Sequence, residues 1–272
     1  MYPSRKSSII FLIALLIVSL THNTVKADFY VIAGGGKKVG KEITALPCTI
    51  TQSGFYYIAK DLHGGTTDHG ISIDTSNVTI DLMGFSLVGP GSDTTDYHGV
   101  YSGHSTASNI EVRNGTICDF GQHGYYMPLG SQEGHRVFNI RAINNGGKGI
   151  HISGDAPIIE QCTVINNDSD GITCGDGGVI KSNVCYDNEG SGIVAFTGCT
   201  VINNSCRNNS SHGILASFAS NVIGNTCKNN TDHGIYLSGN SYVGQNTCYN
   251  NGTNINACPQ SNPCSKGLNY AP

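Results

Sequence analysis

Tryptophan is absent from this sequence of 272 residues, and only 12% of the residues are charged. The net charge of −4 is small, so the composition gives no electrostatic reason to expect nucleic acid or an anionic membrane surface as a partner. With so few charges, the surface must consist mainly of Asn, Ser, Thr and Gly. Such a surface suits hydrogen bonding to sugars, and it equally suits any stack of repeats.

Apolar runs long enough to span a membrane are also missing. Two basic residues precede an apolar run from Ile9 to Leu20, which is too short to cross a bilayer, and Ala27 places a small residue at a cleavage point. This pattern predicts a secretory signal peptide over residues 1–27, with an uncleaved anchor as the alternative. We therefore expect an exported protein, secreted or periplasmic, with no other membrane attachment.

No segment shows the apolar periodicity of 3.6 residues that predicts an α-helix. A Gly-Ile pair recurs instead, in one step of 22 and three steps of 21 residues, at Gly149, Gly171, Gly192, Gly213 and Gly234. This unit is too short for a propeller blade and lacks the leucine-rich consensus of a horseshoe repeat. It suits one coil of a parallel β-helix, in which each strand pairs with its counterpart one coil further on.

Several columns of aligned residues support this interpretation. Apolar residues stand one and three positions after the repeat glycine, so both positions should point inward. Two asparagine columns should form hydrogen-bonded ladders between coils, and they are Asn145, Asn167, Asn188, Asn209, Asn230 and Asn183, Asn204, Asn225, Asn246. Four cysteines share a column with Ala142 and Val164, which favours buried free thiols over a disulfide ladder.

The sequence therefore predicts an all-β fold, a single-stranded right-handed parallel β-helix of about eight coils with three short strands per coil. We expect an N-terminal cap over residues 28–66, the β-helix over 67–255 and a C-terminal cap or tail over 256–272. The chain has eleven cysteines and no Cys-x-x-Cys pair, so a zinc or redox site is not expected. A disulfide between Cys258 and Cys264 is one of two alternatives for the tail.

The residue before each repeat glycine is neither apolar nor uniform. This position holds His69, His98, His123, Lys148, Asp170, Ser191, His212 and His233. Two residues after the glycine stand further outward groups, among them Tyr126 and His151. A stripe of this kind could bind a polysaccharide laid along the coils. The alternative is turn chemistry, because His and Asp are tolerated before a glycine that bends the chain.

Over most of residues 65–255, this pattern and the coil length resemble the pectin-lyase-like superfamily of right-handed β-helices. The stretch from Asn167 to Gly171 is similar to the Asn-Thr-Asp-Gly stretch of polygalacturonases, and His212-Gly213 is similar to their Gly-His-Gly. The paired Asp of that family is replaced here by Gly190-Ser191, and its Arg-x-Lys has no match. Because inverting hydrolysis requires two carboxylates, a hydrolase is disfavoured.

A lyase or epimerase requires a positive charge against the uronate and a base for the C5 proton. We expect Lys148 or His151 to act as the base, with Asp170 holding a cation or orienting the base. The expected substrate-binding residues are His98, His123, Tyr126 and His212. The motifs of alginate epimerases and pectate lyases are not visible, so the sequence leaves open whether the protein is an enzyme.

The expected partner is a polysaccharide bound by a monomer. No cofactor is required by the residues, but calcium is a possible one, through Asp155, Asp168, Asp170 and Asp176. The alternative function is a non-catalytic extracellular or surface scaffold. That alternative is favoured by the asparagine and cysteine columns, because they serve only the fold. It is also favoured by the missing carboxylate pair, because a hydrolase would need one.

Overall fold

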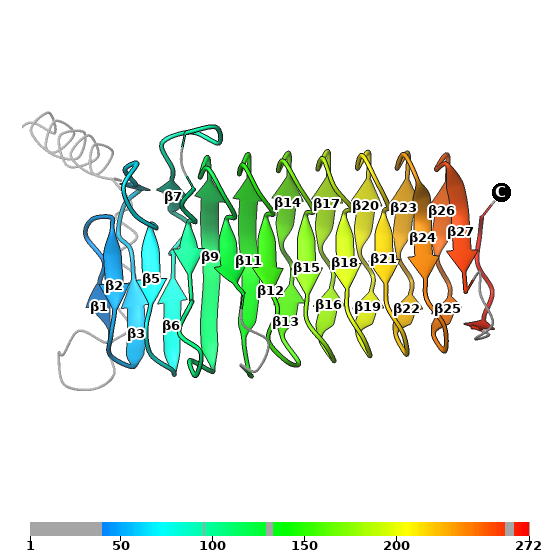
Figure 1. Cartoon of the computed structure of the whole chain (residues 1–272), viewed down its shortest axis with the longest axis horizontal. Coiled ribbons are helices and arrows are strands. Elements are labelled where there is room, and N and C mark those ends of the chain that lie inside the picture. The colour runs from blue at the N-terminus through cyan, green and yellow to red at the C-terminus, as the bar shows by residue number, and fades with distance from the viewer. Residues whose placement is uncertain (1–39, 95, 129–132, 259–263, 272) are drawn as a thin grey trace, which may run out of the picture. The chain divides into compact units, whose positions relative to one another are not determined.

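The computed structural model describes residues 40–94, 96–128, 133–258 and 264–271 of the chain (Figure 1). The predicted signal peptide lies outside these residues, so the prediction of export stays a prediction. All regular elements of the described part are β-strands. No helix in that part is long and apolar enough to cross a membrane.

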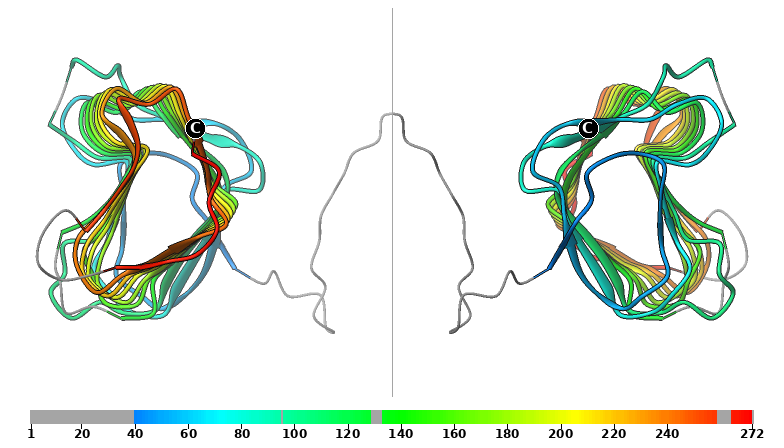
Figure 2. Two further views of the ribbon diagram at one scale, coloured as in Figure 1. Left: turned by 90° about the vertical axis from the view of Figure 1, so that its right-hand side faces the viewer. Right: turned by 90° about the vertical axis from the view of Figure 1, so that its left-hand side faces the viewer.

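Ten parallel strands form the first face of the coil stack. They are β2 (Cys48–Ile50), β5 (Ile71–Ile73), β8 (Val100–Tyr101), β10 (Tyr125–Met127), β12 (Ile150–Ile152), β15 (Ile172–Cys174), β18 (Ile193–Ala195), β21 (Ile214–Ala216), β24 (His233–Leu237) and β27 (Thr253–Ala257). Each strand pairs with the strand one coil further on, so the end-on views in Figure 2 show the coils superposed.

The other two faces share a sheet of 18 strands. The second face holds β1 (Lys41–Glu42), β3 (Gly54–Tyr57), β6 (Val78–Asp81), β13 (Ile158–Glu160), β16 (Val179–Lys181), β19 (Thr200–Ile202), β22 (Asn221–Ile223), β25 (Tyr242–Gly244) and β28 (Ser265–Lys266). The third face holds β4 (Leu62–His63), β7 (Ser86–Val88), β14 (Thr163–Ile165), β17 (Val184–Tyr186), β20 (Ser205–Arg207), β23 (Thr226–Lys228) and β26 (Thr247–Tyr249). Two longer strands run across both faces, β9 (Ile110–Cys118) and β11 (Arg136–Ile143).

The prediction of three short strands per coil is confirmed for most coils, but the described residues form ten coils rather than about eight. The first coil was missed because Pro47 precedes Cys48, which pairs with Ile71. The last was missed because Asn254 precedes Ile255, which pairs with Ile235. Neither coil carries the repeat glycine, so a count of glycines leaves both out.

The repeat glycine is needed where coils touch. A Cβ on Gly192 would lie 2.7 Å from the carbonyl oxygen of Gly213 and 2.8 Å from Nδ2 of Asn209. Real Cβ atoms do not approach other atoms so closely, so only glycine lets the next coil pack at this distance. The predicted inward columns are confirmed, because Ile150, Ile172 and the aligned residues of the eight coils that carry the repeat glycine are fully buried.

Two asparagine ladders run through the interior, as predicted. In the first, Nδ2 of Asn167 donates to Oδ1 of Asn188 at 2.9 Å, and Nδ2 of Asn188 donates to Oδ1 of Asn209 at 3.0 Å. The second ladder repeats this contact from Asn183 to Asn204 at 3.0 Å. These amides also bond backbone groups of the neighbouring coils, so they satisfy polar atoms that the turns bury.

The cysteine predictions are also confirmed. The four column cysteines are free and fully buried, and they are Cys185, Cys206, Cys227 and Cys248. Burial raises the pKa of Cys185 and Cys227 well above the ordinary thiol value, so these groups stay uncharged. Cys258 and Cys264 form a disulfide in the tail.

Candidate functional site

The candidate site lies on the outer side of the first face and is built from two columns. The pre-glycine column holds the residue before each repeat glycine, from His69 to His233. The outward strand column holds the residue two positions after each repeat glycine, and strand pairing aligns Tyr101, Tyr126, His151, Thr173, Val194, Leu215 and Tyr236. Neighbouring members of either column are one coil apart, about 4.8 Å in a β-sheet.

Three imidazoles of the pre-glycine column stack on one another. Ring centroids are 4.9 Å apart between His69 and His98, and 5.0 Å apart between His98 and His123. Nδ1 of His98 accepts the backbone N–H of His123 at 3.1 Å, and Nδ1 of His123 accepts that of Lys148 at 2.7 Å. These bonds assign the neutral tautomer with its proton on Nε2.

The stacked imidazoles are held in the uncharged state. Burial, with a contribution from the neighbouring histidines, lowers the pKa of His98 to about 3. Burial and the charge of Lys148 lower the pKa of His123 to about 4. Each ring is therefore neutral near pH 7 and offers an Nε2–H donor.

Tyrosines from the outward strand column cover the imidazole stack. The ring of Tyr126 lies 4.3 Å from that of His98 and 4.5 Å from that of His123, measured between centroids. Tyr101 lies 6.0 Å from Tyr126 in the same column. Sequence reasoning missed Tyr101, although it stands two residues after Gly99 and so carried the same positional signal as Tyr126.

An ion pair continues the site on the next two coils. Nζ of Lys148 lies 3.0 Å from Oδ2 of Asp170 and donates to Oγ1 of Thr173 at 2.9 Å. Oδ1 of Asp170 accepts the backbone N–H of Ser191 at 2.9 Å. Both charged side chains are about four-fifths buried, with exposures of 22% and 21%, so the pair is fixed rather than freely solvated.

His151 lies beside this ion pair, because β12 and β15 align it with Thr173. Its Nε2 is 3.0 Å from Oγ of Ser153, and its Nδ1 is buried without a hydrogen-bond partner. Burial, together with Lys148 and His123, lowers the pKa of His151 to about 3. The structure thus brings Lys148, His151 and Asp170 together, next to His123.

His212 is not part of this cluster. It stacks on His233 at 5.1 Å and on Tyr236 at 5.5 Å between ring centroids, near the C-terminal end of the column. Ser191 separates it from Asp170 along the pre-glycine column. The four expected substrate-binding residues therefore form two groups, with His98, His123 and Tyr126 in one and His212 in the other.

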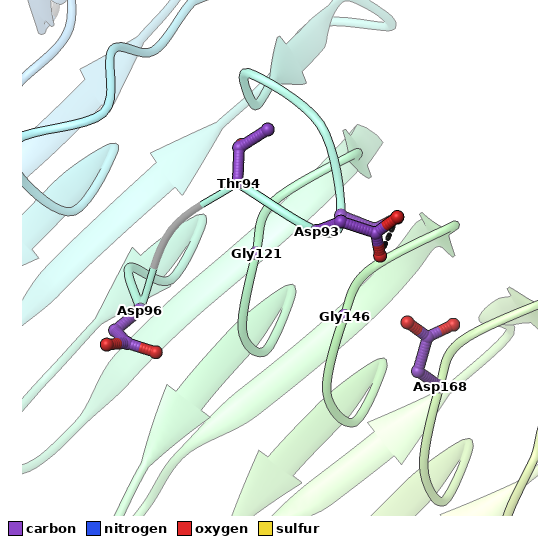
Figure 3. Close-up of a pocket in the computed structure, with 7 residues that line it drawn as sticks. Asp93, Thr94, Asp96, Gly121, Gly146 and Asp168 are labelled. Carbon is purple, nitrogen blue, oxygen red and sulfur yellow. Dashed lines mark hydrogen bonds between the residues drawn. The ribbon is translucent and has the colours of Figure 1, made fainter.

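A cleft of about 390 Å³ opens beside the pre-glycine column, at the turns that precede it (Figure 3). Its lining residues are Ser92, Asp93, Thr94, Asp96, Gly121, Gly146 and Asp168. Burial, with Glu189 and Asp93 nearby, raises the pKa of Asp168. Ser92, Asp93, Thr94 and Asp96 form one wall of the cleft, and the turns of the following coils form the other.

The acidic residues named for calcium do not converge. Asp170 is already bonded to Lys148 and to the Ser191 backbone, and Oδ1 of Asp176 accepts the backbone N–H of Thr197 at 2.8 Å. Within residues 40–271 as described, no three His, Cys, Asp or Glu side chains are placed to hold a metal ion. The residues therefore do not fit a calcium site.

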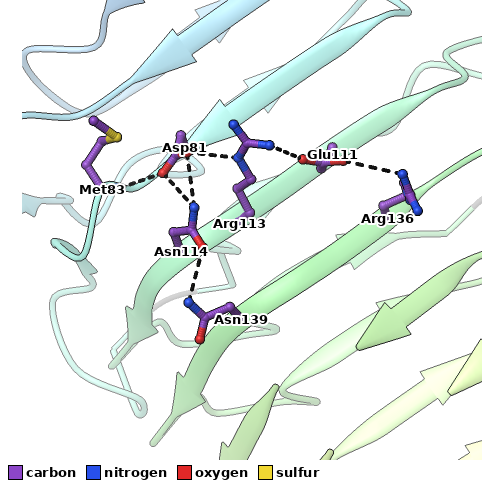
Figure 4. A network of polar contacts seen from close by, with 7 residues as sticks. All are labelled: Asp81, Met83, Glu111, Arg113, Asn114, Arg136 and Asn139. Atoms are coloured by element: carbon purple, nitrogen blue, oxygen red, sulfur yellow. Dashed lines mark hydrogen bonds and ion pairs between the residues drawn. The ribbon is translucent and has the colours of Figure 1, made fainter. Parts of the chain in front are cut away.

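A second polar cluster lies on the other sheet (Figure 4). Arg113 makes ion pairs of 2.8 Å with both Asp81 and Glu111, and Arg136 lies 3.9 Å from Glu111. Because each guanidinium has a carboxylate partner, this network neutralises itself and ties successive coils together. It was not foreseen from the sequence, since 32 residues separate Asp81 from Arg113 in the irregular early coils.

Solved structures with similar folds share little sequence with this chain. The A-module of the Azotobacter vinelandii mannuronan C-5 epimerase AlgE4 aligns with a TM-score of 0.57 and 14% identity, covering 81% of this chain and 80% of that one. A mutant of the periplasmic alginate epimerase AlgG aligns with a TM-score of 0.56 and 13% identity, covering 79% of this chain and 70% of that one. The enzymatically active domain of bacteriophage CBA120 tailspike protein 2 aligns with a TM-score of 0.57 and 14% identity, covering 80% of this chain and 42% of that one. At such identities the likeness concerns the fold alone.

A search of curated proteins finds no match to this sequence. The family model described as "Right handed beta helix region" matches residues 32–200 and 98–253, which together cover most of the chain. This match agrees with the parallel coils of the described structure and with the resemblance seen in the sequence. The chain therefore belongs to the right-handed β-helix family.

Proposed function

We propose that this chain is an exported protein that binds and processes an acidic polysaccharide along the outer side of its first face. The observation that carries the proposal is the continuous run of rings and charges from His98 to Asp170, on consecutive coils. Neutral Nε2–H groups can donate to sugar oxygens, tyrosine rings can pack against sugar faces, and Lys148 can face a carboxylate. The similar fold of two epimerases, whose names give mannuronan and alginate as their substrates, supports the choice of an acidic polysaccharide.

The chemistry that fits this site begins with removal of the C5 proton of a uronate, as a lyase or an epimerase requires. Lys148 supplies positive charge against the uronate carboxylate, and Asp170 fixes its position. His151 is uncharged, and in the tautomer with its proton on Nδ1 the Nε2 beside Ser153 has the lone pair that takes a proton. A bound carboxylate would raise the pKa of His151, since a nearby negative charge favours the imidazolium, and this makes the ring a stronger base when substrate is present.

Hydrolysis is a poorer fit to the same site. Asp170 carries the only carboxylate among the members of the pre-glycine column, and it is held by Lys148. Inverting hydrolysis uses one carboxyl group as the acid and a second as the base, and retaining hydrolysis uses one as the acid and a second as the nucleophile. A single carboxylate that is already ion-paired fits neither route. We therefore assign Lys148, His151 and Asp170 to elimination or epimerisation, with Lys148 as the alternative base.

The test uses the full secreted chain on a panel of uronate polymers. Elimination leaves an unsaturated uronate that is followed by ultraviolet absorbance, and epimerisation is followed by proton NMR of the polymer. The Lys148→Ala, His151→Ala, Asp170→Ala triple variant should lose turnover and keep its circular dichroism spectrum. His63→Ala serves as the control, because this exposed histidine lies on the third face. Full activity in the triple variant would refute the assignment.

The second candidate function is a non-catalytic extracellular scaffold. The observation that favours it is that Nδ1 of His69, His98 and His123 accepts the backbone N–H of the next coil. This bond gives the pre-glycine histidines a role in the fold that needs no ligand. If the chain binds no polymer of the panel, the scaffold is the better explanation of the same column.

A further inference from the structure

A different surface of the molecule carries charge that the proposed site does not use. On the outer side of the third face, strand pairing aligns Tyr186 with Arg207, Arg207 with Lys228, and Lys228 with Tyr249. We call these four residues the tyrosine–cation stripe. Its strands β17, β20, β23 and β26 follow one another along the stack in Figure 1.

The two cations of the stripe lack acidic partners. Among the described residues, Lys148 and Lys181 each pair with a carboxylate, but neither Arg207 nor Lys228 does. They stand on adjacent strands, about 4.8 Å apart at the backbone, so the two positive charges repel each other. The turn after Arg207, residues 208–211, reads Asn-Asn-Ser-Ser and adds no negative charge.

Each cation lies over a tyrosine ring instead. Cζ of Arg207 is 4.3 Å from the ring centroid of Tyr186, and Nζ of Lys228 is 5.2 Å from that of Tyr249. A cation over an aromatic face is attracted to it but keeps its net charge. The guanidinium and ammonium therefore remain able to bind an anion, with a ring on either side of the pair along the stripe.

The residues beside the stripe are small. Two positions earlier on the same strands stand Val184, Ser205, Thr226 and Thr247, which also face outward. Three of them carry hydroxyl groups that can donate to or accept from sugar oxygens. Large side chains therefore stand next to a row of short, mostly hydroxylated ones over four successive coils.

We propose that the tyrosine–cation stripe is a second binding site for an acidic polysaccharide, remote from the candidate site on the first face. Arg207 and Lys228 would bind carboxylates of the polymer, and Tyr186 and Tyr249 would pack against sugar rings at each end. The choice of polysaccharide as the partner rests on the proposed function, whereas the binding surface itself is argued from the stripe alone. Its role is to hold a long polymer on the protein while the first face acts on it.

The experiment measures binding of polygalacturonate and alginate to the full chain by affinity electrophoresis, with uncharged dextran as the blank. The Arg207→Gln, Lys228→Gln double variant should bind about fivefold to tenfold more weakly, the loss expected when two charge contacts at the surface are removed. It should also show a weaker dependence of binding on salt. Turnover of a short oligosaccharide that cannot reach both faces should stay at the wild-type rate.

The matched control removes the same charge elsewhere. Lys60→Gln with Lys266→Gln changes two exposed lysines outside the stripe, so it corrects for net charge. Asp187→Asn should strengthen binding, because it removes the carboxylate next to Tyr186 and Asn tolerates the backbone φ of 55° at this position.

Each outcome decides something. Equal binding by the stripe variant and the lysine control would overturn the second site while leaving the proposed function intact. Tighter binding of single-stranded DNA than of either uronate polymer, lost in the stripe variant, would overturn the choice of polysaccharide. If the wild-type chain binds no acidic polymer, the proposed function fails, and the second site fails with it.

Discussion

Replacing Asn188 by alanine should destabilise the protein far more than replacing an asparagine on the surface. The Asn188 side chain makes four hydrogen bonds inside the stack. Its Nδ2 donates to the Val164 carbonyl at 3.1 Å and to Asn209 Oδ1 at 3.0 Å. Its Oδ1 accepts the backbone N–H of Asn167 at 3.2 Å and the Asn167 side-chain amide at 2.9 Å.

The expected cost follows from what the alanine variant leaves behind. The buried backbone N–H of Asn167 loses its acceptor, which costs about 1–3 kcal/mol, and the other lost hydrogen bonds cost about 1 kcal/mol each. Because the neighbouring amides can shift slightly, we expect a total of about 3–5 kcal/mol in the free energy of unfolding. A loss of this size is a large part of the stability of an ordinary domain.

Urea unfolding followed by circular dichroism measures the effect, with Asn221→Ala as the control. Asn221 is exposed on β22, so its loss should change the free energy of unfolding by no more than about 0.5 kcal/mol. The Asn188→Ala, Asn209→Ala double variant should lose less than the sum of the single losses, because the two side chains share a bond. Similar unfolding midpoints for Asn188→Ala and Asn221→Ala would refute the view that the ladder holds the coils together.

Three further predictions concern the core and the imidazole stack. The pKa of His98, about 3, lies below its ordinary value of 6.5, so the stability that the neutral ring provides above pH 6.5 is lost as the pH falls toward 3. The free energy of unfolding measured in urea should therefore fall between pH 7 and pH 5, by about 1 kcal/mol per buried histidine after allowance for solvent, and equal values at the two pH values would contradict this. Cys206→Ala should keep its free energy of unfolding in urea within about 1.5 kcal/mol of the wild type, whereas Cys206→Leu should lose more, because the aligned positions from Ala142 to Cys248 hold only small side chains. Gly192→Ala should lower the thermal midpoint by several degrees, since its Cβ would lie 2.7 Å from the Gly213 carbonyl oxygen, and an unchanged midpoint would show that the coils can separate there.

The fold could be predicted from the sequence wherever the repeat is strict. Ile172, Ile193 and Ile214 stand 21 residues apart, and the structure pairs them as the period requires. The asparagine ladders followed from the same spacing, because a fixed offset places like residues above one another. The coils that contain Cys48 and Ile255 escaped prediction, since Pro47 and Asn254 stand there in place of the repeat glycine.

The candidate site was predictable in position and less so in contacts. The spacing placed Lys148 and Asp170 on neighbouring coils, but the ion pair depends on side-chain conformations that a period does not fix. The same spacing placed His212 next to His233 and three coils beyond Lys148, and the structure shows the two imidazole rings stacked at 5.1 Å between centroids. The network around Arg113 had no sequence signal, because the early coils have no constant length.

The asparagine ladders give the stack a direction and a unit of growth. In each ladder the amide of one coil donates forward to the oxygen of the next, from Asn145 to Asn251 in one case and from Asn183 to Asn269 in the other. A whole coil inserted between two others would find the same donor below and the same acceptor above, so the protein can change length by entire repeats at little cost. A shorter insertion would break the alignment of both ladders unless it left the stack through a turn, as residues 90–94 do. Relatives of this chain should therefore differ in length by multiples of one coil, and their remaining insertions should gather at the turns that border the candidate site.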